Sequence, residues 1–189
     1  SVKTRIGFET PEEWEQLLPV FKDYPIHELI IHPRTRSQLY RGEPHRAAFG
    51  QALETLRFPV IYNGDLFTAE SVREVTGMFP QAAGVMLGRG LLSNPALLRQ
   101  LQGGAALSME DLTHFHDYLF RAYEKTWHPL TAVGRMHVFL KYFAHSLNVP
   151  FKYVREALRA NKMDAYQDAV GEMFAQAKLK EEPHYSQPE

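Results

Sequence analysis

The stretch GVMLGRGLLSNP, residues 84–95, is the most informative part of this chain. A short apolar run leads into Gly88-Arg89-Gly90, and Pro95 is expected to open a helix shortly afterwards. Glycines on both sides of an arginine leave backbone N–H groups accessible to an anion, and a helix N-terminus adds the positive end of its dipole. The stretch therefore predicts a phosphate-binding turn, although a strand-to-helix turn also requires glycine for purely steric reasons.

Upstream of this turn, short apolar runs alternate with longer helical patterns. Their spacing suits parallel strands joined by helical crossovers. Strands are expected over residues 2–6, 28–31, 59–62 and 83–87, and helices over residues 10–22, 45–56 and 68–77. The helix opened by Pro95 is expected to end at Gly103-Gly104, which is the expected domain boundary.

Four parallel strands do not close a barrel of eight. The two expected edge strands, residues 2–6 and 83–87, also carry little of the charge that protects an exposed edge. The last loops of a (β/α)8 barrel commonly bind a cofactor phosphate. We therefore expect an α/β fold in which residues 1–104 form the C-terminal half of a TIM barrel, its rim binding the cofactor. A complete four-stranded open sheet is the alternative.

After residue 104 only helical periodicity remains. Ser108-Met109-Glu110-Asp111 is a capping box, and the helix that it opens is expected to end near Thr126. Further helices are expected around residues 136–147, 151–159 and 165–178. Residues 105–180 are thus predicted to form an all-α helical bundle domain, and residues 181–189 a flexible tail.

The composition narrows the class of protein. The net charge of −1 excludes a generally polycationic binder but leaves room for a basic face. No long apolar run or charged leader suggests a membrane span or a secretory signal, so a cytoplasmic location fits. The chain has no cysteine, which excludes disulfides and thiol chemistry within these residues.

Polar residues gather at the carboxyl ends of the expected strands. They are Lys3, Arg5, His32, Arg34, Asn63, Gly64, Asp65, Gly88 and Arg89. A single lysine on a strand is usually a solvated edge residue, but four strands that each deliver polar groups to one rim favour a functional site. Arginine and backbone N–H groups suit a dianionic phosphate, whereas lysine, histidine and asparagine suit the polar atoms of a planar heteroaromatic ring.

The expected helical domain carries a basic stretch. From Arg121 to Lys162 there are eight lysines and arginines against two glutamates, a net of +6 with histidine neutral. An RNA-binding face and an ordinary solvated helix surface are equally compatible with this composition. Exposed aromatic residues for base stacking would come from Tyr123, Trp127, Tyr142 and Tyr153. The histidines show no metal-ligand spacing, so no metal site is expected.

Four motifs carry a resemblance to a known family. They are VKTRIG at residues 2–7, HPRTRSQLYRG at residues 32–42, NGD at residues 63–65, and the stretch at residues 84–95. In this order and spacing they resemble the second half of a tRNA-dihydrouridine synthase. The resemblance implies an FMN-dependent oxidoreductase that reduces selected uridines of tRNA to dihydrouridine, with NADPH as the reductant.

The same resemblance assigns roles to residues. It places Lys3 and His32 against the flavin ring, Asn63, Gly64 and Asp65 in support of FMN, and Gly88 and Arg89 at its phosphate. It also implies that Arg5 and Tyr40 lie near the target uridine, and it favours tRNA contact by the basic residues of the helical domain, represented by Arg135, Lys141 and Arg155.

Two departures from the family pattern matter. Pro33 stands where the family often has glycine or alanine, which stiffens the loop. The family's general acid is a cysteine in the N-terminal half, and this chain has none. The expectation is therefore an inactive fragment whose partners are tRNA and the missing N-terminal half, and which self-associates through its unpaired sheet edges. Another FMN-dependent TIM-barrel oxidoreductase and a non-enzymatic RNA-binding module are the alternatives.

Overall fold

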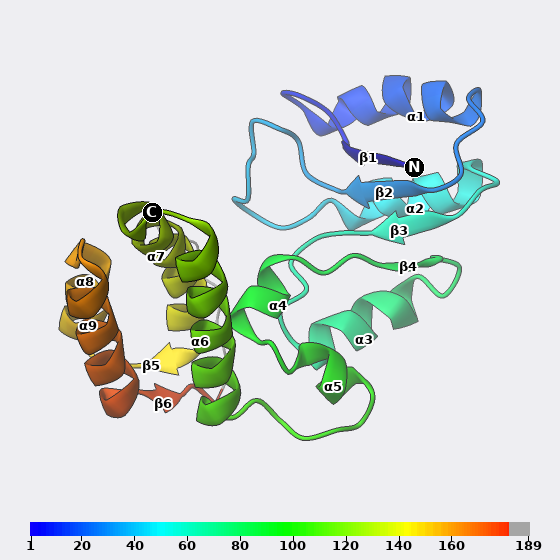
Figure 1. Ribbon diagram of the computed structural model, residues 1–189. Helices are drawn as coiled ribbons and strands as arrows, with labels where there is room; N and C mark the ends of the chain where they lie inside the picture. Colours follow the sequence, from blue (N-terminus) through cyan, green and yellow to red (C-terminus); the bar gives the residue numbers. More distant parts are fainter. Residues whose placement is uncertain (182–189) are drawn as a thin grey trace. The chain divides into compact units, whose positions relative to one another are not determined.

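The computed structural model describes residues 1–181, which form two compact units. The first consists of residues 1–66 and 70–88, and the second of residues 67–69 and 89–181. The first unit contains a parallel sheet with strands in chain order (Figure 1). The strands are β1 (Val2–Arg5), β2 (Leu29–His32), β3 (Val60–Tyr62) and β4 (Gly84–Val85).

Helical segments connect the strands of the first unit. They are η1 (Pro11–Glu13), α1 (Trp14–Lys22), α2 (Arg46–Thr55) and α3 (Ala69–Met78). The Glu13 carboxylate accepts the backbone N–H of Thr10 at 2.8 Å, as a capping residue does. The indole of buried Trp14 donates to the carbonyl of Ala48 at 2.9 Å, which joins α1 to α2.

The register of the strands separates an apolar face from a polar one. Leu29 pairs with Val60, and Ile31 pairs with Tyr62; all four side chains are buried. Because side chains alternate along a strand, these residues share one face. The opposite face carries Lys3 paired with Ile30, and Arg5 paired with His32. Lys3, Arg5 and His32 therefore lie on one face.

The second unit is mostly helical. Its elements are α4 (Arg89–Ser93), α5 (Leu97–Leu101), α6 (Met109–Thr126), α7 (Pro129–His145), β5 (Leu147–Asn148), α8 (Phe151–Arg159), α9 (Met163–Gln176) and β6 (Lys178–Leu179). The last four helices share one buried cluster, to which Leu112, Met136, Val154 and Met173 contribute. No helix within residues 1–181 is long and apolar enough to cross a membrane.

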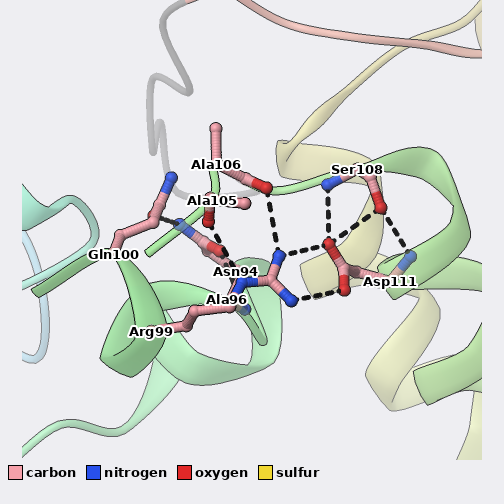
Figure 2. Close-up of polar contacts among 8 residues, drawn as sticks. All are labelled: Asn94, Ala96, Arg99, Gln100, Ala105, Ala106, Ser108 and Asp111. Carbon is pink, nitrogen blue, oxygen red and sulfur yellow. Dashed lines mark hydrogen bonds and ion pairs between the residues drawn. The ribbon is translucent and has the colours of Figure 1, made fainter. Parts of the chain in front are cut away.

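A polar latch spans the Gly103-Gly104 segment. Arg99 donates to both carboxylate oxygens of Asp111, at 3.0 and 2.7 Å, and to the carbonyls of Ala105 and Ala106 (Figure 2). Asp111 also accepts the Ser108 backbone N–H at 2.8 Å. These bonds, above all the one from Arg99, hold the pKa of Asp111 well below its usual range. The latch joins α5 directly to α6.

Several expectations agree with the structure and several were wrong. The mixed α/β fold with a parallel sheet is confirmed, and the helix at residues 151–159 has the expected bounds. The helix expected between Pro95 and Gly103-Gly104 corresponds to the shorter α5, whereas α4, which begins at Arg89, was missed. The Asn94 side chain accepts the Ala96 N–H at 3.1 Å and contacts Gln100, so it separates α4 from α5.

Other differences lie further along the chain. α7 begins at Pro129, earlier than expected, because proline suits the first position of a helix. The short antiparallel pair β5 and β6 was missed, since two-residue strands leave no periodicity. The compact units divide at Gly88 and Arg89, whereas the domain boundary expected at Gly103-Gly104 stays a prediction. Most of the tail expected at residues 181–189 lies outside the described residues.

Candidate functional site

His32 is the most buried of the expected ring-contacting residues. It ends β2, and only 5% of its surface is exposed. Burial lowers the pKa of His32 to about 3, with further contributions from the cations Arg5, Arg34 and Lys3. The imidazole is therefore neutral at physiological pH, and it offers one donor and one acceptor nitrogen.

Lys3 shares the polar face of the sheet with Arg5 and His32. Burial, and then the charge of Arg5, lower the pKa of the Lys3 ammonium from its ordinary value. Arg5 itself donates from Nη1 to the carbonyls of Thr35 and Leu39, each at 2.7 Å. Its guanidinium lies 5.4 Å from the centre of the Tyr40 ring. The structure thus brings Arg5 and Tyr40 together beside His32, whose ring centre is 5.9 Å from that of Tyr40.

An ion pair that sequence reasoning missed organises the same rim. Arg34, of which 1% is exposed, donates from Nη1 to Asp65 Oδ1 at 2.8 Å and from Nη2 to Asp65 Oδ2. Nη2 also donates to the carbonyl of Gly42. Arg34 therefore joins the end of β2, the end of its loop and the turn after β3. The only hint in the sequence is an arginine two residues beyond His32 and an aspartate directly after Asn63-Gly64.

The turn after β3 approaches its neighbours closely. Asn63 donates from Nδ2 to the carbonyl of Met86 at 2.8 Å, which ties the ends of β3 and β4 together. A Cβ on Gly64 would lie 3.5 Å from the His32 ring and 3.4 Å from the Tyr62 hydroxyl. Asp65 has a φ of 48°, in the left-handed region that short polar residues tolerate. Asn63, Gly64 and His32 are thus neighbours, as predicted.

Gly88 and Arg89 follow β4. A Cβ on Gly88 would meet nothing within 4 Å, so the backbone is open to a ligand there. Arg89, the first residue of α4, belongs to the second unit, where its guanidinium lies 5.3 Å from the centre of the Phe67 ring. Because α4 has five residues, its dipole is small, so the groups at this turn that suit an anion are the arginine and the exposed backbone.

The basic residues of the second unit lie on its surface. Arg135, Lys141 and Arg155 are exposed. Of the four aromatic residues considered for stacking, Trp127 is exposed, and Arg135 lies 5.5 Å from its ring. Tyr123 and Tyr153 are only partly buried but pack against the core cluster. Within residues 1–181, no three histidine, aspartate or glutamate side chains are grouped so as to hold a metal ion.

A family model for dihydrouridine synthases matches residues 1–182. The chain belongs to the dihydrouridine synthase family. Among curated relatives, the tRNA-dihydrouridine(16) synthase of Pseudomonas putida is 28% identical over 153 residues, which cover 76% of this chain and 46% of that protein. The Escherichia coli O157:H7 protein of the same name is 34% identical over 52% of this chain and 31% of its own length.

A third dihydrouridine synthase relative, the probable tRNA-dihydrouridine synthase of Staphylococcus aureus strain Mu50, is 31% identical over 66% of this chain and 40% of that protein. The chain thus spans less than half the length of these dihydrouridine synthase relatives.

Proposed function

We propose that this chain contributes the C-terminal half of the TIM barrel and the helical domain of a tRNA-dihydrouridine synthase, an oxidoreductase that reduces uridine in tRNA with FMN and NADPH. The observation that carries the proposal is the polar face at the carboxyl ends of the parallel strands, where Lys3, His32 and Asn63 gather in a member of this family. An RNA-binding module without enzymatic activity has no use for this face.

The residues fit a flavin mononucleotide. Lys3 and neutral His32 are suited to the polar atoms of the ring, and the turn of Asn63, Gly64 and Asp65 lies beside them. Since Arg34 occupies the Asp65 carboxylate, Asp65 contributes through its backbone and through the shape of the turn. When bound, FMN supplies the hydride that reduces the uridine C5=C6 bond, after its own reduction by NADPH.

Gly88 and Arg89 are assigned to the phosphate. The open space at Gly88 admits an anion close to the backbone, and Arg89 supplies a cation directly after it in the chain. A mononucleotide phosphate at this point of a β/α unit agrees with where barrels of this type bind phosphate.

The remaining half of the enzyme is proposed to lie outside these residues. This chain contains no cysteine to protonate uridine C5, and we assign the general acid to a preceding half-barrel. β1 and β4 are the edges of the described four-stranded sheet. We therefore expect the isolated chain to be inactive and to self-associate through these edges. A cytoplasmic location belongs to the same proposal.

tRNA is the proposed substrate. Arg5 and Tyr40 are assigned to the target uridine, since both lie beside His32. Arg135, Lys141 and Arg155 are assigned to tRNA phosphates, with Trp127 available for stacking beside Arg135.

The flavin assignment is tested by Arg89→Ala in the full-length protein. A charge-assisted hydrogen bond contributes roughly 1.5–3 kcal/mol, so FMN affinity should fall by at least about tenfold, measured by quenching of flavin fluorescence. Arg57→Ala, at an exposed position outside the site, is the control. An unchanged FMN affinity in Arg89→Ala would overturn the assignment.

The tRNA assignment is tested by reversing Arg135, Lys141 and Arg155 to glutamate together. tRNA affinity should fall and its dependence on salt should flatten, because fewer counterions are released. Reduction of the flavin by NADPH should survive. Wild-type values for both the affinity and the salt slope would exclude this surface.

A further inference from the structure

The loop after β1 is held rigidly. The Glu13 carboxylate accepts three successive backbone N–H groups, those of Phe8, Glu9 and Thr10, at 2.7–2.8 Å. A Cβ on Gly7 would lie 2.5 Å from the carbonyl oxygen of Thr10, so the loop closes with no room for a side chain there. Residues 7–10 therefore have one well-defined backbone conformation.

This loop is also fastened to the loop after β2. Arg36 donates its backbone N–H to the carbonyl of Gly7, and Ser37 donates its own to the carbonyl of Phe8, each at 2.9 Å. The Ser37 hydroxyl donates to the carbonyl of Glu9 at 3.1 Å. The two loops thus form one stiff segment at the carboxyl ends of β1 and β2.

The stiff segment presents an aromatic ring to the outside. Phe8 is 52% exposed, and the guanidinium of Arg36 lies 4.7 Å from the centre of its ring. The bonds to Glu13 and Ser37 fix the backbone from which this ring projects. A rigid, half-exposed phenylalanine with an arginine over one face is prepared to receive a second planar group.

The chemistry around Phe8 indicates what that group is. Tyr40 is 43% exposed on the same pair of loops and has Arg5 beside its ring, so these loops carry two aromatic–arginine pairs. Arg36 and Arg41 are exposed cations, whereas Glu9 and Glu43 are exposed carboxylates. Because the charge is mixed, the surface suits stacking of a base with one nearby phosphate better than general attraction to a polyanion.

We propose that Phe8 and Arg36 form a stacking platform for an unpaired base of the RNA substrate, next to the nucleotide that Tyr40 and Arg5 receive. This inference rests on the proposed function and adds a contact for a nucleotide flanking the target. Phe8 stacks on the base, and Arg36 pairs with an adjacent phosphate.

The test uses the full-length protein loaded with FMN and an unmodified tRNA transcript. Phe8→Ala should weaken tRNA binding about 5- to 100-fold, the range for losing one base–aromatic stack, with no change in the salt slope. Arg36→Gln should weaken binding and reduce the salt slope by about one unit. Phe8→Trp should retain affinity, and the fluorescence of the added tryptophan should be quenched when tRNA binds.

Tyr24→Ala is the matched control. Tyr24 is an exposed aromatic residue that follows α1, and a helix of a parallel β/α unit ends near the amino ends of the strands. It should bind tRNA like the wild type.

Two results would overturn the inference. In the first, Phe8→Ala binds tRNA as tightly as the control. In the second, Phe8→Ala loses FMN or melts at a lower temperature, which would mean that the ring packs against another part of the protein. If the wild type itself binds neither FMN nor tRNA, the proposed function fails as well.

Discussion

The buried pair of Arg34 and Asp65 offers a test of how the rim is built. In Arg34→Gln the Asp65 carboxylate loses both guanidinium bonds. Removing one partner of a buried ion pair usually costs 3–5 kcal/mol. We expect about 3 kcal/mol here, because 32% of the Asp65 side chain is exposed to water. At about 2–4 °C per kcal/mol for a protein of this size, the unfolding temperature should fall by about 6–12 °C.

The pKa of His32 shows whether the Arg34–Asp65 pair acts on its surroundings through charge or only by keeping the loop closed. Burial is the main cause of its low pKa; Arg34 lowers that pKa further, and Asp65 raises it. In Arg34→Gln the pKa of His32 should therefore rise from about 3. In Asp65→Asn the same pKa should stay low, since the cation remains and the carboxylate is gone.

The assay is NMR titration of the His32 imidazole, together with thermal unfolding followed by circular dichroism. If both variants raise the pKa of His32 to its ordinary range, the loop has opened to water and the electrostatic reasoning is refuted. A loss of stability below about 1 kcal/mol in both variants would refute the structural reasoning.

Three further predictions concern stability. Tyr166→Phe removes the hydroxyl that lies 3.0 Å from Nε2 of buried His116, so the free energy of unfolding should fall by about 1–3 kcal/mol. Tyr118→Phe, at an exposed position, is the control and should leave the unfolding temperature unchanged in the same melting assay. Burial lowers the pKa of both His32 and His116 below the unfolded value near 6.5. Because the unfolded chain binds these protons more readily, the free energy of unfolding should be highest above pH 6.5 and should fall as the pH drops. For His32 alone the loss should be about 2 kcal/mol between pH 7 and 5. Urea titrations that give equal free energies of unfolding at both pH values would contradict this. Gly7→Ala should lower the unfolding temperature, because the added Cβ would lie 2.5 Å from the carbonyl oxygen of Thr10. Gly88→Ala has open space around the added Cβ and should melt like the wild type. Equal unfolding temperatures for the two variants would count against the loop geometry.

Elements with strong local signals were predictable from the sequence. The capping box at Ser108 and Asp111 marked the start of α6 correctly, and the helix expected over residues 151–159 agrees with α8. These features depend on neighbours in the chain, which a single sequence displays directly.

Features that depend on distant residues were not predictable. Arg34 and Asp65 lie 31 positions apart, and neither sequence segment indicates that the two side chains pair. The hydrogen bond from the Ser37 hydroxyl to the carbonyl of Glu9 depends in the same way on how two loops meet. The side chain of Asn94 that separates α4 from α5 was hidden by the stronger signal of Pro95.

We propose that this chain belongs to an enzyme that forms dihydrouridine in tRNA with FMN. The most direct test incubates the full-length protein with FMN, NADPH and an unmodified tRNA transcript, and measures dihydrouridine by mass spectrometry of the digested RNA. The account predicts a gain of two mass units at a uridine, dependent on NADPH and strongly reduced in Arg89→Ala at limiting FMN. FMN-loaded protein that binds the transcript and oxidises NADPH, yet leaves every uridine unreduced, would contradict it.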